Sequence, residues 1–537
     1  MIEIRCRISV SGPSPDYQPP TTNPRRMNTN AIVQKLWSFC DILRDDGITY
    51  QDYVTELTYL LFLKMAEETG REETDDEIHI PEGYRWADLT ALEGNEQLTF
   101  YRQMLIELEN QGSALVQQIY KNAQTSMRKP KNVSKLVTSI DQLDWFSARK
   151  EGLGDLYEGL LEKNATESKS GAGQYFTPRP LIDAMIDVVD PQPLQVIQDP
   201  AAGTGGFIIA ADQHIKDHTD LFAMPEEDYD FQRRDAFHAV ELVPETHRLG
   251  LMNMLLHDIE CNYHRGDSLS PLGANIDDAD VILTNPPFGT STGGGAPGRD
   301  DFTFPTSNKQ LAFLQHIYRG LKPGGRAAVV APDNVLFEDN TGRKIRTDLM
   351  NKCSLHTILR LPTGIFYAQG VKTNVLFFTR GETDEDNTDE VWVYDMRTNS
   401  RTYGKRNPLK PDDFDDFLDA WGDDVNAPWN GDFSAREDGD EESRFRRFTR
   451  QEIEERGDNL DITWLHDDDV ERVEDLPPPE DIAAEIMGNL RRAQQEMEGL
   501  MDILEGREKV VEEQVVDETG SSTEETPAAT EVAEPAE

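Results

Sequence analysis

The chain has 537 residues, of which 101 are acidic and 53 basic, so its formal net charge is −48 at pH 7. This length allows more than one domain, and no apolar run is long enough to cross a bilayer; the best candidate, residues 59–66, contains Lys64. The first residues lack the apolar core of a secretory signal, so we expect a cytoplasmic protein with no membrane partner.

Acidic residues are spread along much of the chain. This distribution favours a protein from a halophile, whose carboxylate surface keeps it hydrated in a saline cytoplasm. The alternative is an ordinary acidic protein with a disordered tail. The charge argues against autonomous binding to nucleic acid, whose affinity comes largely from Lys and Arg that replace counterions. It leaves room for DNA contact through a local basic patch or a partner subunit.

The residues that usually bind metals are scattered. The cysteines form no C-x-x-C pair, and the ten histidines show no metalloprotease-type spacing. We therefore predict no disulfide framework and no metal site. The cysteines are Cys6, Cys40, Cys261 and Cys353.

The first part of the chain predicts helices. Residues 1–26 are rich in Pro, Ser and Thr and predict a disordered leader, unless translation starts at Met27. In residues 27–150, apolar side chains recur at spacings of three and four, which indicates an N-terminal helical domain.

Residues 151–400 alternate short apolar runs with amphipathic helices. This pattern predicts a doubly wound α/β domain, with a largely parallel sheet that is covered on both faces. The candidate strands are LQVIQD, FHAVEL, DVILTN, GRAAVVAP, LHTILRLP and TNVLFFTR.

The C-terminal part is acidic. One more strand is expected at EVWVYDMR, before an irregular extension over residues 401–480. Residues 481–508 carry apolar side chains at alternating spacings of four and three, which predicts a heptad helix that docks on a partner or on the body of the protein. Residues 509–537 are disordered by composition.

A glycine-rich turn, DPAAGTGGF, follows the first predicted strand and precedes a helix. Such a turn lets backbone N–H groups approach a ligand at the N-terminus of the helix. The phosphate-binding lysine of a P-loop is missing, so a nucleoside triphosphatase is disfavoured. We expect cofactor contacts from Asp199, Ala201, Gly203, Thr204, Gly205 and Gly206.

Two acidic residues follow the next strands. Glu241 ends the second strand, where a carboxylate can accept both hydroxyls of a ribose, and Asp267 follows a short third strand, where it could accept from an adenine amino group. Alone, either acid would be taken for a solvated loop carboxylate. A ligand with adenine and ribose that is not held through phosphates indicates S-adenosylmethionine.

The fourth strand ends on NPPF, residues 285–288. Two prolines in a row stop a strand, so a rigid turn alone would explain this stretch. After DPAAGTGGF, however, NPPF resembles the methyltransferases that modify the exocyclic amino group of adenine in DNA. Residues 171–189, GAGQYFTPRPLIDAMIDVV, resemble the cofactor-binding segment of the methyltransferase (M) subunits of type I restriction–modification systems. Residues 308–332 and 361–381 are also similar to that family.

This resemblance covers roughly residues 27–400 and implies a Rossmann-like, S-adenosylmethionine-dependent fold. It implies that Asn285 and the carbonyl of Pro286 accept the two N–H groups of the adenine amino nitrogen, next to Pro287. Phe288 would stack on the base after it is flipped out of the duplex. The further cofactor-binding residues that the resemblance implies are Gln174, Tyr175, Phe176, Thr177 and Pro178.

The family's M subunits pair with a specificity (S) subunit, usually as two M per S, and a restriction (R) subunit is possible. The short gap between Phe207 and Asn285 leaves no room for a DNA-reading domain, which agrees with delegated recognition. The alternatives are a methyltransferase for cytosine amino groups, RNA or protein glutamine, and a non-catalytic scaffold. The GQYFTPR segment argues against the former, and the intact Asn285, Gly203 and Gly205 argue against the latter.

Overall fold

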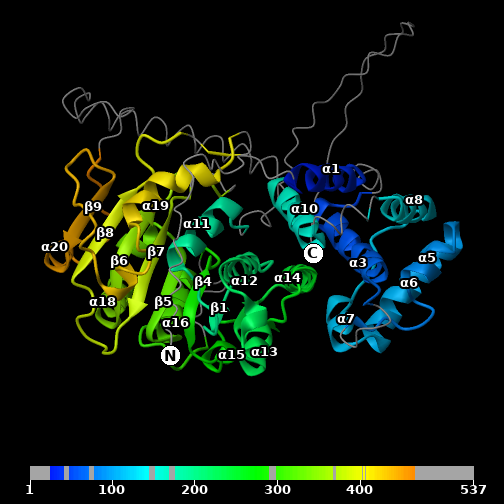
Figure 1. Cartoon of the computed structure of the whole chain (residues 1–537), viewed down its shortest axis with the longest axis horizontal. Coiled ribbons are helices and arrows are strands. Elements are labelled where there is room, and N and C mark those ends of the chain that lie inside the picture. The colour runs from blue at the N-terminus through cyan, green and yellow to red at the C-terminus, as the bar shows by residue number, and fades with distance from the viewer. Residues whose placement is uncertain are drawn as a thin grey trace, which may run out of the picture. The chain divides into compact units, whose positions relative to one another are not determined.

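The computed structural model describes residues 25–40, 47–71, 78–143, 145, 152–167, 176–289, 298–366, 371–401, 403–404 and 407–465 (Figure 1). Most of the expected leader, the heptad helix at 481–508 and the tail at 509–537 lie outside these residues. Within them, no helix has both the length and the apolar character that a membrane span requires.

The N-terminal part is helical, as predicted. Its helices are α1 (Arg25–Ser38), α3 (Tyr50–Thr69), α5 (Trp86–Thr90), α6 (Gly94–Gln111), α7 (Ala114–Ile119) and α8 (Pro130–Asp141). Helix α3 begins at a capping box, in which Thr49 and Asp52 satisfy each other's backbone N–H, and it ends at Gly70 in the left-handed conformation. Its many fully buried side chains make it the centre of this helical part.

Helix α10 (Leu153–Glu167) follows and packs on α1 and α3. It also packs on α14 (Pro244–Leu256), which belongs to the sheet region. Helix α14 also packs on α3 and α7, so α10 and α14 together tie the two parts of the chain to each other.

The sheet region contains nine strands in the order β3-β2-β1-β4-β5-β7-β6-β8-β9. The strands from β3 to β5 in this order are parallel, whereas β7 is antiparallel to both of its neighbours and β9 is antiparallel to β8. The strands are β1 (Ile197–Asp199), β2 (Phe237–Glu241), β3 (Asn262–Arg265), β4 (Ala279–Thr284), β5 (Leu321–Pro332), β6 (Cys353–Arg360), β7 (Thr373–Arg380), β8 (Glu390–Asp395) and β9 (Phe445–Thr449).

Helices cover both faces of this sheet, as a doubly wound fold requires. Along β4, Val281 and Leu283 enter the apolar core that includes side chains of α11 (Arg179–Val189) and α12 (Gly206–His218). Ile282, between them, enters a second core with α16 (Lys309–Arg319) and α18 (Thr341–Lys352). The shorter helices are α13 (Glu226–Arg234), α15 (Pro271–Ala274), α17 (Asn334–Phe337) and the 3-10 turn η3 (Leu221–Ala223).

The extension expected to be irregular contains regular elements. They are η4 (Pro411–Phe414), α19 (Asp415–Trp421), η5 (Pro428–Asn430), β9 and α20 (Arg450–Glu455). Strand β9 extends the sheet beyond β8. Its sequence, FRRFT, has too few apolar residues to signal a strand, so the backbone of β8 rather than the side-chain pattern accounts for it.

Candidate active site

The predicted site residues gather at one edge of the sheet. Strands β2, β1 and β4 are parallel neighbours, so their carboxyl ends meet at this edge. Asp199, Glu241 and Asn285 lie at or directly after these ends. The strand order reverses between β1 and β4, which is where doubly wound sheets bind ligands.

The glycine turn after β1 has the backbone that its sequence predicts. Gly203 and Gly205 have φ values of 59° and 85°, in the left-handed region that favours glycine. A Cβ atom on Gly205 would lie 2.0 Å from Cε of Met254 on α14. Helix α12 begins directly afterwards at Gly206, so its N-terminus faces this edge.

Glu241 is bound to this turn. One oxygen of its carboxylate accepts from the backbone N–H of Gly203 at 3.0 Å, and the other accepts from that of Val243 at 2.7 Å. Burial raises the pKa of Glu241 above its usual range. The next side chain, Leu242, is 60% exposed. It is an exposed apolar side chain directly after a carboxylate, and the sequence pattern did not single it out.

Asp267 lies in the loop after β3 and is exposed. Its carboxylate accepts from the backbone N–H of Leu269 at 2.9 Å, while the neighbouring Ser268 donates to the carbonyl of Pro200 at 2.5 Å. The loop is therefore fixed against the residue that follows β1, with a carboxylate at its surface.

Asp199 faces inward. It is 1% exposed, and one of its oxygens accepts from Oγ1 of Thr284 at 2.7 Å and from the N–H of Ala201 at 3.0 Å. Burial raises its pKa to about 7. Its side chain thus links the glycine turn to the end of β4.

Asn285 is held by a residue far away in the sequence. It is 9% exposed, and its Nδ2 donates to Oγ1 of Thr177 at 3.0 Å. Its Oδ1 is buried and has no hydrogen-bond partner among the described residues. We expected Thr177 to contact the cofactor, and the structure places its hydroxyl on the amide of Asn285.

The rest of the NPPF turn is less buried. Pro286 is buried, whereas Pro287 and Phe288 are half-buried. The ring of Phe288 meets the ring of Phe366 edge-on, with centroids 6.3 Å apart.

Only some of the residues around the predicted site belong to the described part of the chain. Phe176, Thr177 and Pro178 begin the segment that leads into α11. The predicted cofactor residues Gln174 and Tyr175 lie outside the described residues. The same is true of residues 290–297, which follow the NPPF turn, and of residues 367–370 after Phe366.

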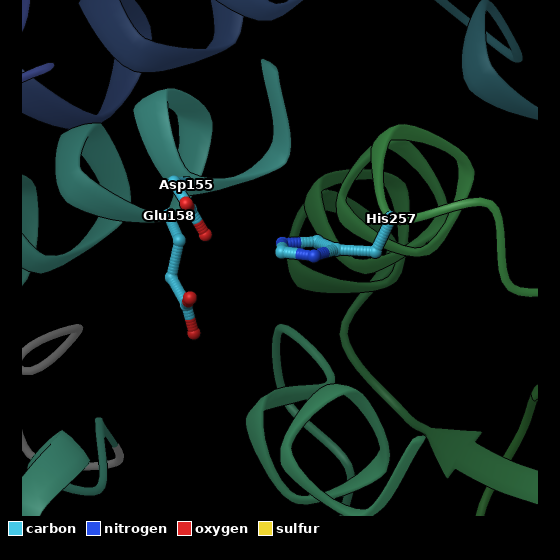
Figure 2. A group of neighbouring side chains, drawn as sticks. All are labelled: Asp155, Glu158 and His257. Carbon is cyan, nitrogen blue, oxygen red and sulfur yellow. The ribbon is translucent and has the colours of Figure 1, made fainter. Parts of the chain in front are cut away.

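A separate group of possible metal ligands lies between α10 and α14. Asp155 and Glu158 face His257 (Figure 2), and one ligand atom of each lies within 4.8 Å of the others. Burial lowers the pKa of His257 to about 4, so its ring is neutral at pH 7. Glu158, however, already accepts from Nη1 of Arg179 at 2.8 and 2.9 Å, and that positive charge disfavours a cation. We therefore interpret this group as a contact between two helices.

Two protein-family models match the chain. Residues 32–143 match the HsdM N-terminal domain, and residues 148–472 match the N-6 DNA methylase. The first match falls on the helical part of the fold and the second includes the sheet.

Close relatives match over nearly the whole chain. The methylase subunit of the type I restriction enzyme EcoKI from Escherichia coli K12 is 49% identical, over 88% of this chain and 95% of its own length. The StySPI methylase subunit from Salmonella potsdam is 48% identical, over 92% of this chain and 99% of its own length.

Two solved structures are similar to this chain over most of its length. The EcoKI M protein is 44% identical over 91% of this chain and 100% of that chain, with a TM-score of 0.53. A chain from a study of complex assembly and conformational transition in a type I R-M system gives a TM-score of 0.68, at 26% identity over 89% of this chain and 99% of that chain.

Proposed function

Because this chain belongs to the methylase subunits of type I restriction enzymes, which methylate N6 of adenine in DNA, we propose that Asn285 and its neighbours hold the target base. Its membership confirms the fold, the N6-adenine activity and the place in a type I complex that the sequence predicts. This membership excludes the alternative methyltransferases for cytosine amino groups, RNA or protein glutamine. We place the activity in the cytoplasm, where the DNA substrate lies.

The main support for this role of Asn285 is the pattern of hydrogen bonds that its side-chain amide makes. Its Nδ2 is bound to Thr177, whereas its Oδ1 is buried and lacks a donor among the described residues. A buried carbonyl oxygen without a donor costs free energy, on the order of 1–3 kcal/mol. An incoming N–H group at this position would satisfy the acceptor.

The adenine amino group is such a donor. Its nitrogen is a poor nucleophile, because its lone pair is delocalised into the ring. When Oδ1 of Asn285 and the carbonyl of Pro286 accept its two N–H bonds, the nitrogen becomes more tetrahedral and richer in electrons. Phe288 stacks on the flipped base and fixes its plane. Catalysis then rests on orientation and charge placement, with no general base required.

The methyl donor that the family implies is S-adenosylmethionine, which supplies an electrophilic methyl group on a sulfonium. The residues fit such a ligand, because nothing lies within 4 Å of a Cβ atom built on Gly203, just before the N-terminus of α12. Glu241 retains a free lone pair on each oxygen for the ribose hydroxyls, and the exposed Leu242 offers an apolar surface to the adenine. Asp267 is exposed and available to accept from an amino group.

We propose that a specificity subunit selects the DNA site, usually with two copies of this chain, and that a restriction subunit joins for cleavage. The predicted heptad helix at 481–508 is the docking element, because its apolar seam needs a partner. Removing residues 481–508 should abolish co-purification with the specificity subunit, as judged by affinity capture. Unchanged capture would contradict this assignment.

Substituting Asn285 tests the assignment of the catalytic group. Asn285→Ala should lower adenine methylation at least about 100-fold, as when a transition-state hydrogen bond is removed. Its binding of S-adenosylmethionine should remain unchanged. The measurements are base-modification sequencing of DNA from cells that express the complex, and calorimetry with the purified chain.

Asn275→Ala is the matched control, because Asn275 is exposed and its Nδ2 donates to the carbonyl of Pro271 at the start of α15. It should methylate like the wild type. Methylation that persists in Asn285→Ala would refute the role given to this amide.

A further inference from the structure

One exposed surface of the helical part contrasts with the acidity of the whole chain. Residues 110–140 contain no Asp or Glu, although 101 of the 537 residues are acidic. The same stretch carries five cations, all of them exposed. They are Lys121, Arg128, Lys129, Lys131 and Lys135.

The fold directs these cations outward. Helix α8 buries Val133, Leu136, Val137 and Ile140 on one side. Lys131 and Lys135 lie one turn apart on the exposed side of α8, and Arg128 lies just before the N-terminus of this helix. Like charges at this spacing repel each other, so helix stability does not explain them.

Residues 302–332 and 349–381 also contain no Asp or Glu, but the reason there is different. Strands β5, β6 and β7 run through them, and burial in the sheet excludes acidic side chains. Several cations in these stretches, although not Lys309, Arg326 or Lys372, form ion pairs with acids among the described residues. The pairs are Arg319 with Asp301, Lys322 with Asp280, Lys352 with Asp348 and Arg360 with Asp461.

Four of the five cations of residues 110–140 lack such compensation within the described part of the chain. Among the described residues, no ion pair joins Lys121, Arg128, Lys131 or Lys135 to a carboxylate. Exposed polar neutral side chains, including Gln117, Gln118, Asn122 and Gln124, share the stretch. Lys and Arg with neutral hydrogen-bonding side chains are the usual contacts to DNA phosphates.

This stretch is also fixed to the methylase part. Arg248 on α14 donates to the carbonyl of Ile119 at 2.6 Å and to that of Lys121 at 2.7 Å. Its guanidinium also lies over the ring of Tyr59, 5.2 Å from the centroid. The surface is therefore attached to the helix that packs beside the glycine turn.

We propose that Arg128, Lys131 and Lys135, with Lys121 beside them, contact the phosphate backbone of the duplex whose adenine is methylated. The proposal rests on the activity on DNA, and it adds a contact from this chain to those of the specificity subunit. A chain with a net charge of −48 is repelled by DNA, so exposed cations on a stretch that contains no acids offer DNA a favourable place to approach. Backbone contacts carry no sequence information, which is compatible with recognition by another subunit.

The salt dependence of DNA binding tests this proposal. The triple variant Arg128→Gln, Lys131→Gln and Lys135→Gln is compared with the wild-type full chain in complex with its specificity subunit. Anisotropy of a labelled duplex gives Kd across a series of NaCl concentrations. The slope of log Kd against log salt concentration should fall by about three, because each phosphate contact contributes about one.

A matched control removes three exposed cations from three other helices, by Lys35→Gln, Arg102→Gln and Lys344→Gln. It loses the same net charge and should keep nearly the wild-type slope. Equal slopes for the wild type and the surface variant would overturn the proposal. So would a surface variant that binds DNA normally but loses its specificity subunit, because the surface would then be a protein contact.

This outcome is separable from a failure of the proposed catalytic site. At low salt and saturating DNA, the surface variant should still methylate adenine, whereas Asn285→Ala should not. Unchanged melting temperatures for the surface variant and its control would exclude misfolding as the cause of weaker DNA binding.

Discussion

The proposed cofactor half and the proposed adenine half of the site differ in how their polar groups are hydrogen-bonded. Both oxygens of Glu241 already accept backbone N–H groups, which fixes the carboxylate against the glycine turn before any ligand arrives. In the adenine half, Asn285 is held only through its Nδ2, and its Oδ1 stays without a donor among the described residues. Under the proposed assignment, the cofactor half is preformed, whereas the adenine half is completed by its substrate.

This difference predicts that the two halves fail at different steps. Glu241→Ala removes the acceptor for two backbone N–H groups and for the ribose, and charged hydrogen bonds contribute about 1.5–3 kcal/mol each. Binding of S-adenosylmethionine should weaken more than about 100-fold. Thr177→Val frees the amide of Asn285 to rotate and leaves its Nδ2 unpaired, which should lower kcat about 30-fold and leave cofactor affinity unchanged. Calorimetry and single-turnover methylation separate the two effects.

The conservative variant Thr177→Ser is the control for this comparison. It keeps the hydroxyl that accepts from Asn285, so kcat should recover most of its wild-type value. If Thr177→Val weakened cofactor binding as strongly as Glu241→Ala does, Thr177 would belong to the cofactor half, as the sequence suggested.

The sequence predicts much of this fold because its signals are local. The apolar runs of β1, β2 and β4 and the glycine turn of DPAAGTGGF each appear within a few residues. Parallel strand order then brings Asp199, Glu241 and Asn285 to one edge. Strand β9 escaped prediction, because FRRFT lacks the alternating apolar pattern of a strand.

The partners of the site residues were harder to predict than their positions. Thr177 and Asn285 are 108 residues apart, and no local pattern states that their side chains meet. The hydrogen bond between Asp199 and Thr284 could not be predicted either, because it depends on the register of β1 beside β4. The role proposed for Leu242 could have been suggested by the sequence, because Leu242 is an apolar residue directly after the acidic end of a strand.

Asp199 connects the two halves, and its proton makes the stability of the folded chain depend on pH. Its carboxylate accepts from Ala201 in the glycine turn and from Thr284 at the end of β4, and burial raises its pKa from 3.8 to about 7. The folded chain therefore binds this proton more tightly than the unfolded chain. The stability that the proton contributes is full below about pH 4 and is lost as the pH rises through about 7.

Asp199→Asn removes this proton and with it the pH dependence. Between pH 6 and pH 8, the wild type should lose about 1 kcal/mol more unfolding free energy than Asp199→Asn, since one unit of pKa shift corresponds to about 1.4 kcal/mol. Urea denaturation at both pH values measures the difference, and the exposed Asp277→Asn should behave like the wild type. Equal pH dependence in the wild type and Asp199→Asn would mean that this carboxyl titrates alike in both states. The link between the glycine turn and β4 would then be an ordinary ionised contact.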